Sequence, residues 1–153
     1  MIRRMRGEII GAMKIILSAV LCLVSVGGQT LDVRDDSNKV IASYRILAGL
    51  PKHPTPTGDF TIGKIVWNPR REPGKKSLIK GVRIMFKEPD SYIGDPSSQG
   101  GIRMASKDSY ALARLLMDRA GVKPSEAWYQ DVIRGKRSVT VTLPKTIAIR
   151  ISK

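Results

Sequence analysis

Short segments in which apolar and polar residues alternate make up most of the chain after residue 28, and this pattern is typical of β-strands. The segment "QTLDVRDD", which starts at Gln29, alternates in this way and ends in a polar turn cluster at residues 35–38. The segment that follows is apolar again, so residues 29–49 are predicted to form a β-hairpin. Further strands are predicted in "DFTIGKIVWN", "LIKGVRIMF" and "SVTVTLPKTIAIRI".

Proline and glycine mark the connections between these strands. The segment "LPKHPTPTG" holds several prolines and a glycine, which cannot sustain a ladder of backbone hydrogen bonds. The segment "PRREPGKKS" is predicted to be a basic loop. The segment "KEPDSYIGDPSSQGG" is predicted to be one long loop by its composition.

Helical periodicity appears in the second half of the chain. Ser106 is a suitable N-cap for a first helix, which Gly121 would end. A second, short helix is predicted within residues 123–135, with Ser125 as its cap. The buried face of the first helix is predicted to carry Tyr110, Ala113, Leu116 and Met117. With no internal repeat or linker, the body of the chain is predicted to be one mainly β domain, a sheet or sandwich with one or two edge helices.

The N-terminal segment has the pattern of a secretory leader. Four basic residues lie within residues 1–14, and an apolar or small run extends from Ile15 to Val26. This run is short for a membrane span. We therefore expect a leader over residues 1–23, acting as a signal peptide or anchor, and a domain over residues 24–153. The alternative interpretation is that the apolar run is a buried opening strand.

The charge balance indicates anionic partners. The chain has 153 residues and a formal net charge of +14, while its hydrophobic fraction of 42% fits a globular domain. Such a surface suits nucleic acid, anionic lipid or an anionic cell-wall polymer. No basic motif interleaved with aromatic residues and no zinc-ligand spacing is present, so nucleic-acid binding is not expected.

The candidate reactive side chains do not assemble into a known site. The chain has one cysteine, Cys22, and one histidine, His53. Cys22 lies in the apolar run, where a buried hydrophobe is expected, and His53 lies in a proline-rich turn. A zinc site, a Cys–His dyad and any cofactor are therefore not expected. Residues 58–64 match the spacing of a phosphate-binding loop, but Ile65 replaces the required Ser or Thr and the segment is strand-like.

Several segments, read in order, resemble the catalytic domain of the L,D-transpeptidases (the YkuD-like family). They are "VSVGGQTLDVRDDSNKVIASYRILAG", "TPTGDFTIGKIVWNP", "YIGDPSSQGGIRMASKDSYALARLL" and "VTVTLP", and they span about residues 24–145. The resemblance implies a β-sandwich and an exported protein of the periplasm or cell envelope. In the family, an active cysteine attacks a carbonyl of the diaminopimelate-containing stem peptide, D-alanine leaves, and an acceptor amine resolves the thioester.

The nucleophile motif of the family, Ser-His-Gly-Cys-Ile-Arg, is substituted at its two reactive positions. The corresponding residues here are Ser98, Gln99, Gly100, Gly101, Ile102 and Arg103. Glycine stands at the cysteine position and glutamine at the histidine position. The upstream His-Gly pair that supplies the base in the family is also absent between Phe86 and Ile93.

These substitutions put the activity in doubt, since acyl transfer needs both a nucleophile and a base. Ser98 is an unactivated hydroxyl. Gly100 and Gly101 can still present backbone N–H groups, and Arg103 can hold a carboxylate or backbone carbonyls, or be structural. We expect an inactive domain that keeps at most binding of peptidoglycan stem peptides, with membrane contact only through the leader. The alternatives are an active transpeptidase with unrecognised chemistry, a decayed gene product, and a basic nucleic-acid-binding module.

Overall fold

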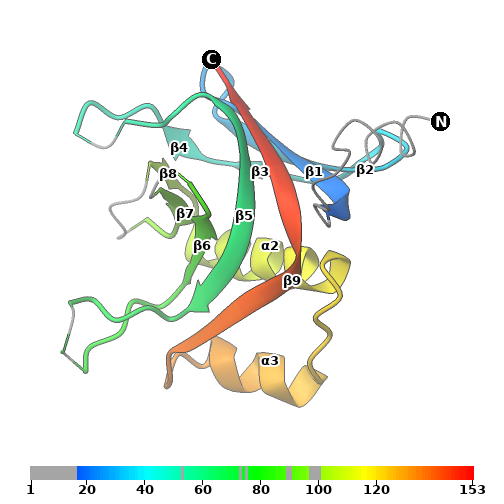
Figure 1. The fold of residues 1–153 in the computed structure, drawn as a ribbon. Coiled ribbons are helices and arrows are strands. Elements are labelled where there is room, and N and C mark those ends of the chain that lie inside the picture. Colours follow the sequence, from blue (N-terminus) through cyan, green and yellow to red (C-terminus); the bar gives the residue numbers. More distant parts are fainter. Residues whose placement is uncertain (1–16, 53, 73, 75, 89–90, 97–100) are drawn as a thin grey trace.

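A computed structural model describes residues 17–52, 54–72, 74, 76–88, 91–96 and 101–153 of the chain. It confirms the mainly β fold: these residues form a single sheet in the order β3-β2-β1-β9-β5-β6-β7-β8-β4, together with two helices (Figure 1). The elements are β1 Leu17–Ser25, β2 Thr30–Asp35, β3 Val40–Arg45, β4 Leu47–Ala48, β5 Gly58–Trp67, β6 Val82–Phe86, β7 Tyr92–Gly94, β8 Ile102–Arg103, α2 Ser106–Arg119, α3 Glu126–Ile133 and β9 Val139–Ser152.

The sheet curls until its two outermost strands meet. β3 and β4 lie at opposite ends of the strand order, yet only Ile46 separates them in the sequence. Gln29, in the turn between β1 and β2, joins the two ends. Its side-chain amide donates to the carbonyl of Ala48 at 3.2 Å and accepts from the Ala48 N–H at 3.1 Å. Its backbone carbonyl accepts from the Ile46 N–H at 3.0 Å, so the sheet is nearly closed at this point.

Strand β1 lies inside the sheet, between β2 and β9. It pairs antiparallel with β2 and parallel with β9. Val20, Cys22 and Val24 alternate into the core, each at most 2% exposed. Residues 17–25 thus form a strand that contains the boundary expected after residue 23, and the leader over residues 1–23 stays a prediction. Residues 1–16, which carry the basic part of the expected leader, lie outside the described residues.

The other sequence-based strands are largely as predicted. β2 and β3 form the hairpin expected over residues 29–49. β5 contains residues 58–64, so the segment with phosphate-loop spacing is a strand, as its composition indicated. The long loop predicted after Phe86 is interrupted by the short strand β7, which pairs with both β6 and β8. β9 bends where four of its residues, 143–146, face Gly63 of β5 (Figure 1).

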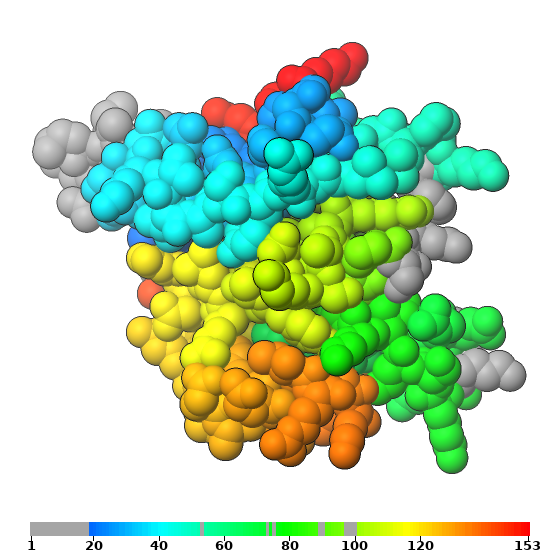
Figure 2. All heavy atoms as spheres, turned by 180° about the vertical axis from the view of Figure 1, so that it is seen from behind, coloured from blue at the N-terminus to red at the C-terminus, as the bar shows by residue number. Residues whose placement is uncertain are grey.

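The two helices cover one face of the sheet. Seen from behind, α2 in yellow and α3 in orange lie below the cyan β2–β3 hairpin (Figure 2). The predicted buried face of α2 is confirmed, and so is the cap of α3, where Ser125 Oγ accepts from the Trp128 N–H at 3.1 Å. The predicted cap of α2 is wrong: Ala105 occupies that position without a side-chain hydrogen bond, and Ser106 is the first helical residue. None of the described helices is long and apolar enough to cross a membrane.

A buried polar contact connects the helices to the end of β5. Asn68 is fully buried and donates through Nδ2 to the carbonyls of Val132 at 2.6 Å and Arg137 at 3.0 Å. Its Oδ1 accepts from the Tyr110 hydroxyl at 2.6 Å, which links α2 to the same side chain. The neighbouring Trp67 stacks on Tyr110 with ring centroids 5.7 Å apart. Asn68 therefore holds both helices in register with the sheet.

The closure by Gln29 predicts a specific loss of stability. We expect Gln29→Ala to lower the free energy of unfolding by about 1–3 kcal/mol, because two partly buried backbone groups of Ala48 lose their partner. Urea denaturation followed by circular dichroism measures the change. Gln130→Ala is the matched control, since Gln130 is exposed on α3 and its side-chain amide donates to the exposed Glu126 carboxylate. Equal effects of the two substitutions would contradict this role of Gln29.

Candidate functional site

The substituted motif lies at strand β8, near one end of the curled sheet. β8 pairs with β7 through Ile93 and Ile102, and with β4 through Ala48 and Ile102. Ile102 is 1% exposed and points into the core, so positions 101 and 103 share the outer face of the sheet. Of the five candidate motif residues, the structure describes Gly101 and Arg103. The other three, Ser98, Gln99 and Gly100, lie outside the described residues.

Gly101 is buried beneath the connection between β4 and β5. A Cβ atom at this position would lie 3.0 Å from the carbonyl oxygen of Pro54 and 3.4 Å from Ser91 Oγ. The Thr55 hydroxyl donates to the Gly101 carbonyl and accepts from the Gly49 N–H at 2.9 Å. One hydroxyl thus fastens the connecting loop onto the position where the family motif carries its cysteine. A side chain at this position would require the loop backbone to give by a few tenths of an ångström.

Cys22 does not replace the missing thiol. It lies in β1, fully buried between Val33 of β2 and Ile149 of β9. Burial raises the pKa of its thiol to about 12, because the thiolate would lose its hydration. His53 lies outside the described residues. Within the ranges that the structure describes, no group of three or more His, Cys, Asp or Glu side chains could hold a metal ion.

Two arginines, on β6 and β8, lie on the outer face beside Gly101. Arg103 follows Gly101 by two residues on the same face. Arg83 on β6 alternates with the buried Val82 and Ile84, so it points outward as well. Its guanidinium carbon lies 4.5 Å from the centre of the Tyr92 ring on β7. The arrangement is a half-buried cationic cluster that can contact an anionic group but contains no nucleophile.

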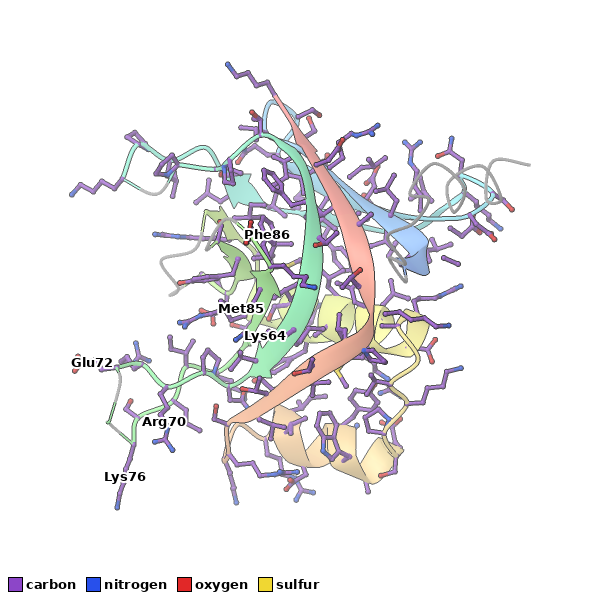
Figure 3. All side chains as sticks on the ribbon, viewed as in Figure 1. Lys64, Arg70, Glu72, Lys76, Met85 and Phe86 are labelled. Atoms are coloured by element: carbon purple, nitrogen blue, oxygen red, sulfur yellow. The ribbon has the colours of Figure 1, made fainter. Side chains whose placement is uncertain are left out.

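The same outer face extends across β5 and towards the basic loop. Lys64 on β5 pairs with Met85 on β6, and both lie on the outer side (Figure 3). Arg70 and Lys76 project on the connection between β5 and β6 (Figure 3). Lys64, Arg70 and Lys76 thus add positive charge on this side, while the acidic Glu72 lies on the same connection (Figure 3).

Sequence reasoning found Gly101 and Arg103 but missed Arg83, Tyr92 and the covering residues Pro54 and Thr55. The alternation in "LIKGVRIMF" puts Arg83 and the buried Ile84 on opposite faces of a strand, so the sequence does indicate that Arg83 points outward. It does not say which strands lie next to β6. The contact between Thr55 and Gly101 joins residues 46 positions apart, so no local pattern could reveal it.

Comparisons with known proteins agree with this geometry. The family model of the L,D-transpeptidase catalytic domain (YkuD) matches residues 20–123, about two thirds of the chain. Among solved structures, an L,D-transpeptidase from Xylanimonas cellulosilytica shares the fold, with a TM-score of 0.54, 12% identity, and coverage of 98% of this chain and 69% of that chain. Comparison with curated protein sequences gives no match.

Two mycobacterial structures are also similar. L,D-transpeptidase 1 of Mycobacterium tuberculosis has a TM-score of 0.48 and 18% identity, with coverage of 89% of this chain and 62% of that chain. An L,D-transpeptidase from Mycobacterium smegmatis has a TM-score of 0.47 and 19% identity, with coverage of 89% and 59%. This chain therefore spans about three fifths of the length of these two proteins.

The close approach of Pro54 predicts that position 101 resists a side chain. We expect Gly101→Ala to destabilise the protein by about 1–3 kcal/mol, because the new methyl group overpacks against the Pro54 carbonyl. Urea unfolding at 25 °C measures the change. Gly27→Ala is the control, since a Cβ there would lie 3.5 Å from Lys153, an ordinary contact. If both variants lose equally little free energy of unfolding, the loop over position 101 accommodates a methyl group and the prediction is wrong.

The burial of Cys22 predicts an unreactive thiol. In the folded protein at pH 8 we expect negligible reaction with an aromatic disulfide reagent, because a thiol with a pKa of about 12 is almost entirely protonated. In guanidinium chloride the single thiol of the chain should react completely. Absorbance of the released thiolate measures both. Fast reaction of the folded protein would show that β1 opens or that Cys22 is accessible.

Proposed function

Since the chain belongs to the L,D-transpeptidase catalytic domain family, we propose that it is a non-catalytic member of that family which binds peptidoglycan. The observation that carries this proposal is Gly101, which stands at the cysteine position of the family motif and lies buried under Pro54 and Thr55. The fold supplies the framework of the family, and the nucleophile position lies under the Pro54–Thr55 segment.

The chemistry of the family supports the absence of turnover. Acyl transfer from a stem peptide begins when a thiolate attacks the peptide carbonyl, and a base must first take the thiol proton. Gly101 has no atom that can attack. Cys22 is fully buried in β1, and its raised pKa keeps it protonated. In the part of the chain that the structure describes, no other thiol or imidazole is present.

Binding can persist without catalysis, because the groups that position a substrate are distinct from those that react with it. The outer face beside Gly101 retains Arg83 and Arg103. The net charge of +14 favours association with an anionic cell wall. Stem peptides carry carboxylates, which suit arginine side chains. We propose accordingly that the ligand is the stem peptide of peptidoglycan and that the protein acts in the cell envelope.

Two measurements on the full chain test this function. We expect the protein to co-sediment with isolated peptidoglycan sacculi at physiological salt, and to release no D-alanine from a tetrapeptide-bearing muropeptide. A folded sample, verified by circular dichroism, is used in both. Release of D-alanine would show an active enzyme and overturn the inactivity. Failure to co-sediment would overturn the binding.

A DNA-binding control separates wall binding from general basicity. A protein that binds only through net charge would also bind duplex DNA, with an affinity that falls steeply as salt rises. We expect binding to sacculi to persist at salt concentrations that abolish binding to DNA. Parallel salt dependence for both polymers would support the nucleic-acid alternative and would remove the case for a specific site.

A further inference from the structure

Three neighbouring strands bring two arginines to either side of a glycine. The register pairs Ile84 of β6 with Ile93 of β7, and Gly94 of β7 with Arg103 of β8. Continuing the first pairing by one residue places Arg83 opposite Gly94. Arg83 and Arg103 therefore lie on the same face, two strand spacings or about 10 Å apart between Cα atoms. Gly94, which has no side chain, lies between them on β7.

Within the part of the chain that the structure describes, both arginines have an unpaired donor atom. The Nε atoms of Arg83 and Arg103 are buried without a hydrogen bond. Arg34 on β2 also has a buried Nε, but its Nη1 donates to Asn38 Oδ1 at 3.1 Å. Buried polar groups without partners are uncommon in folded proteins. Because both residues are only half-buried, their terminal Nη groups are the candidates for binding an external acceptor.

Tyr92 orients one of the two arginines, Arg83. The Arg83 guanidinium stacks on the Tyr92 ring at 4.5 Å, which restricts its rotamers and keeps its edge available for hydrogen bonds. Continuing the β7–β8 register by one residue places Tyr92 beside Gly101. The stacked guanidinium thus lies on the outer face next to the inherited nucleophile position, and Arg103 follows two residues along β8.

We propose that Arg83 and Arg103, with Tyr92 as the stacking platform, form a binding site for a carboxylate group. Guanidinium groups form paired, parallel hydrogen bonds with planar carboxylates, and two such groups across a glycine can bind one carboxylate or two neighbouring ones. The identity of the ligand as a stem-peptide carboxylate rests on the proposed function. The site itself depends only on the register, the stacking and the buried Nε atoms.

The test follows the Nε–Hε signals of the full-length protein by NMR. The probe is a diaminopimelate-containing tetrapeptide, compared with the same peptide amidated at its carboxylates and with inorganic phosphate. We expect the tetrapeptide to shift the signals of Arg83 and Arg103 and to leave that of Arg34 unchanged. The amidated peptide should bind about tenfold or more weakly, because it cannot accept charge-assisted hydrogen bonds.

Variants give a second readout. We expect Arg83→Met and Arg103→Met each to weaken tetrapeptide binding about tenfold or more, and Arg34→Met to leave it unchanged. Arg83→Lys and Arg103→Lys keep the charge and lose the planar fork, so they should restore binding only in part. If a Met variant fails to fold, the Lys variant and the signals of the unmodified protein still decide the question.

The outcomes separate this site from the proposed function. Equal affinity for the amidated peptide, equal affinity for phosphate, or unchanged Arg83 and Arg103 signals on binding would overturn the carboxylate site. If sacculi are still bound in that case, the proposed function stands on another surface. If the tetrapeptide binds through both arginines while sacculi are not bound, the carboxylate site stands and the wall-binding function fails.

Discussion

The two ends of the sheet are held together by the one-residue link at Ile46 and by the side-chain amide of Gln29, and the strands between them depend on this closure. Among the described strands, β3 pairs with β2 alone and β4 with β8 alone, so these two strands are the edges of the sheet and no strand ladder joins them. β4 has only two residues, and it is the strand on which β8 completes its pairing. The positions of Gly101 and Arg103 are therefore set by a contact in the turn after β1.

The sequence pattern predicts the local elements because their causes are local. Alternation places the β2–β3 hairpin, and helical spacing places the buried face of α2. The order of the strands has no such signal: β9, the last strand, lies between β1 and β5, and this pairing joins the two ends of the chain. The α2 cap was misplaced by one residue, since Ser106 satisfies the residue preference for a cap while the backbone turns at Ala105.

The apolar run before residue 27 shows a second limit of prediction from sequence. A short continuous apolar segment fits a leader and a buried strand equally well, because both need hydrophobic residues and neither needs a polar face. In the structure this run pairs with β2 and β9 on its two sides and buries Val20, Cys22 and Val24 in the core. For the site, the motif alone identified Gly101 and Arg103, whereas Arg83 and Tyr92 became part of it only through the register of β6, β7 and β8.

The hydrogen bonds of the Thr55 hydroxyl bear on whether a cysteine could return to position 101 by mutation. It joins the Gly49 N–H and the Gly101 carbonyl, so the cover over position 101 and the segment that follows the closing strand β4 are one unit. A codon change that returned a cysteine to position 101 would meet the Pro54 carbonyl before it met any substrate. A change that loosened the cover first would weaken the attachment beside β4 with no catalytic gain. A return of the cysteine therefore requires an adjustment of the Pro54–Thr55 segment as well as the substitution itself.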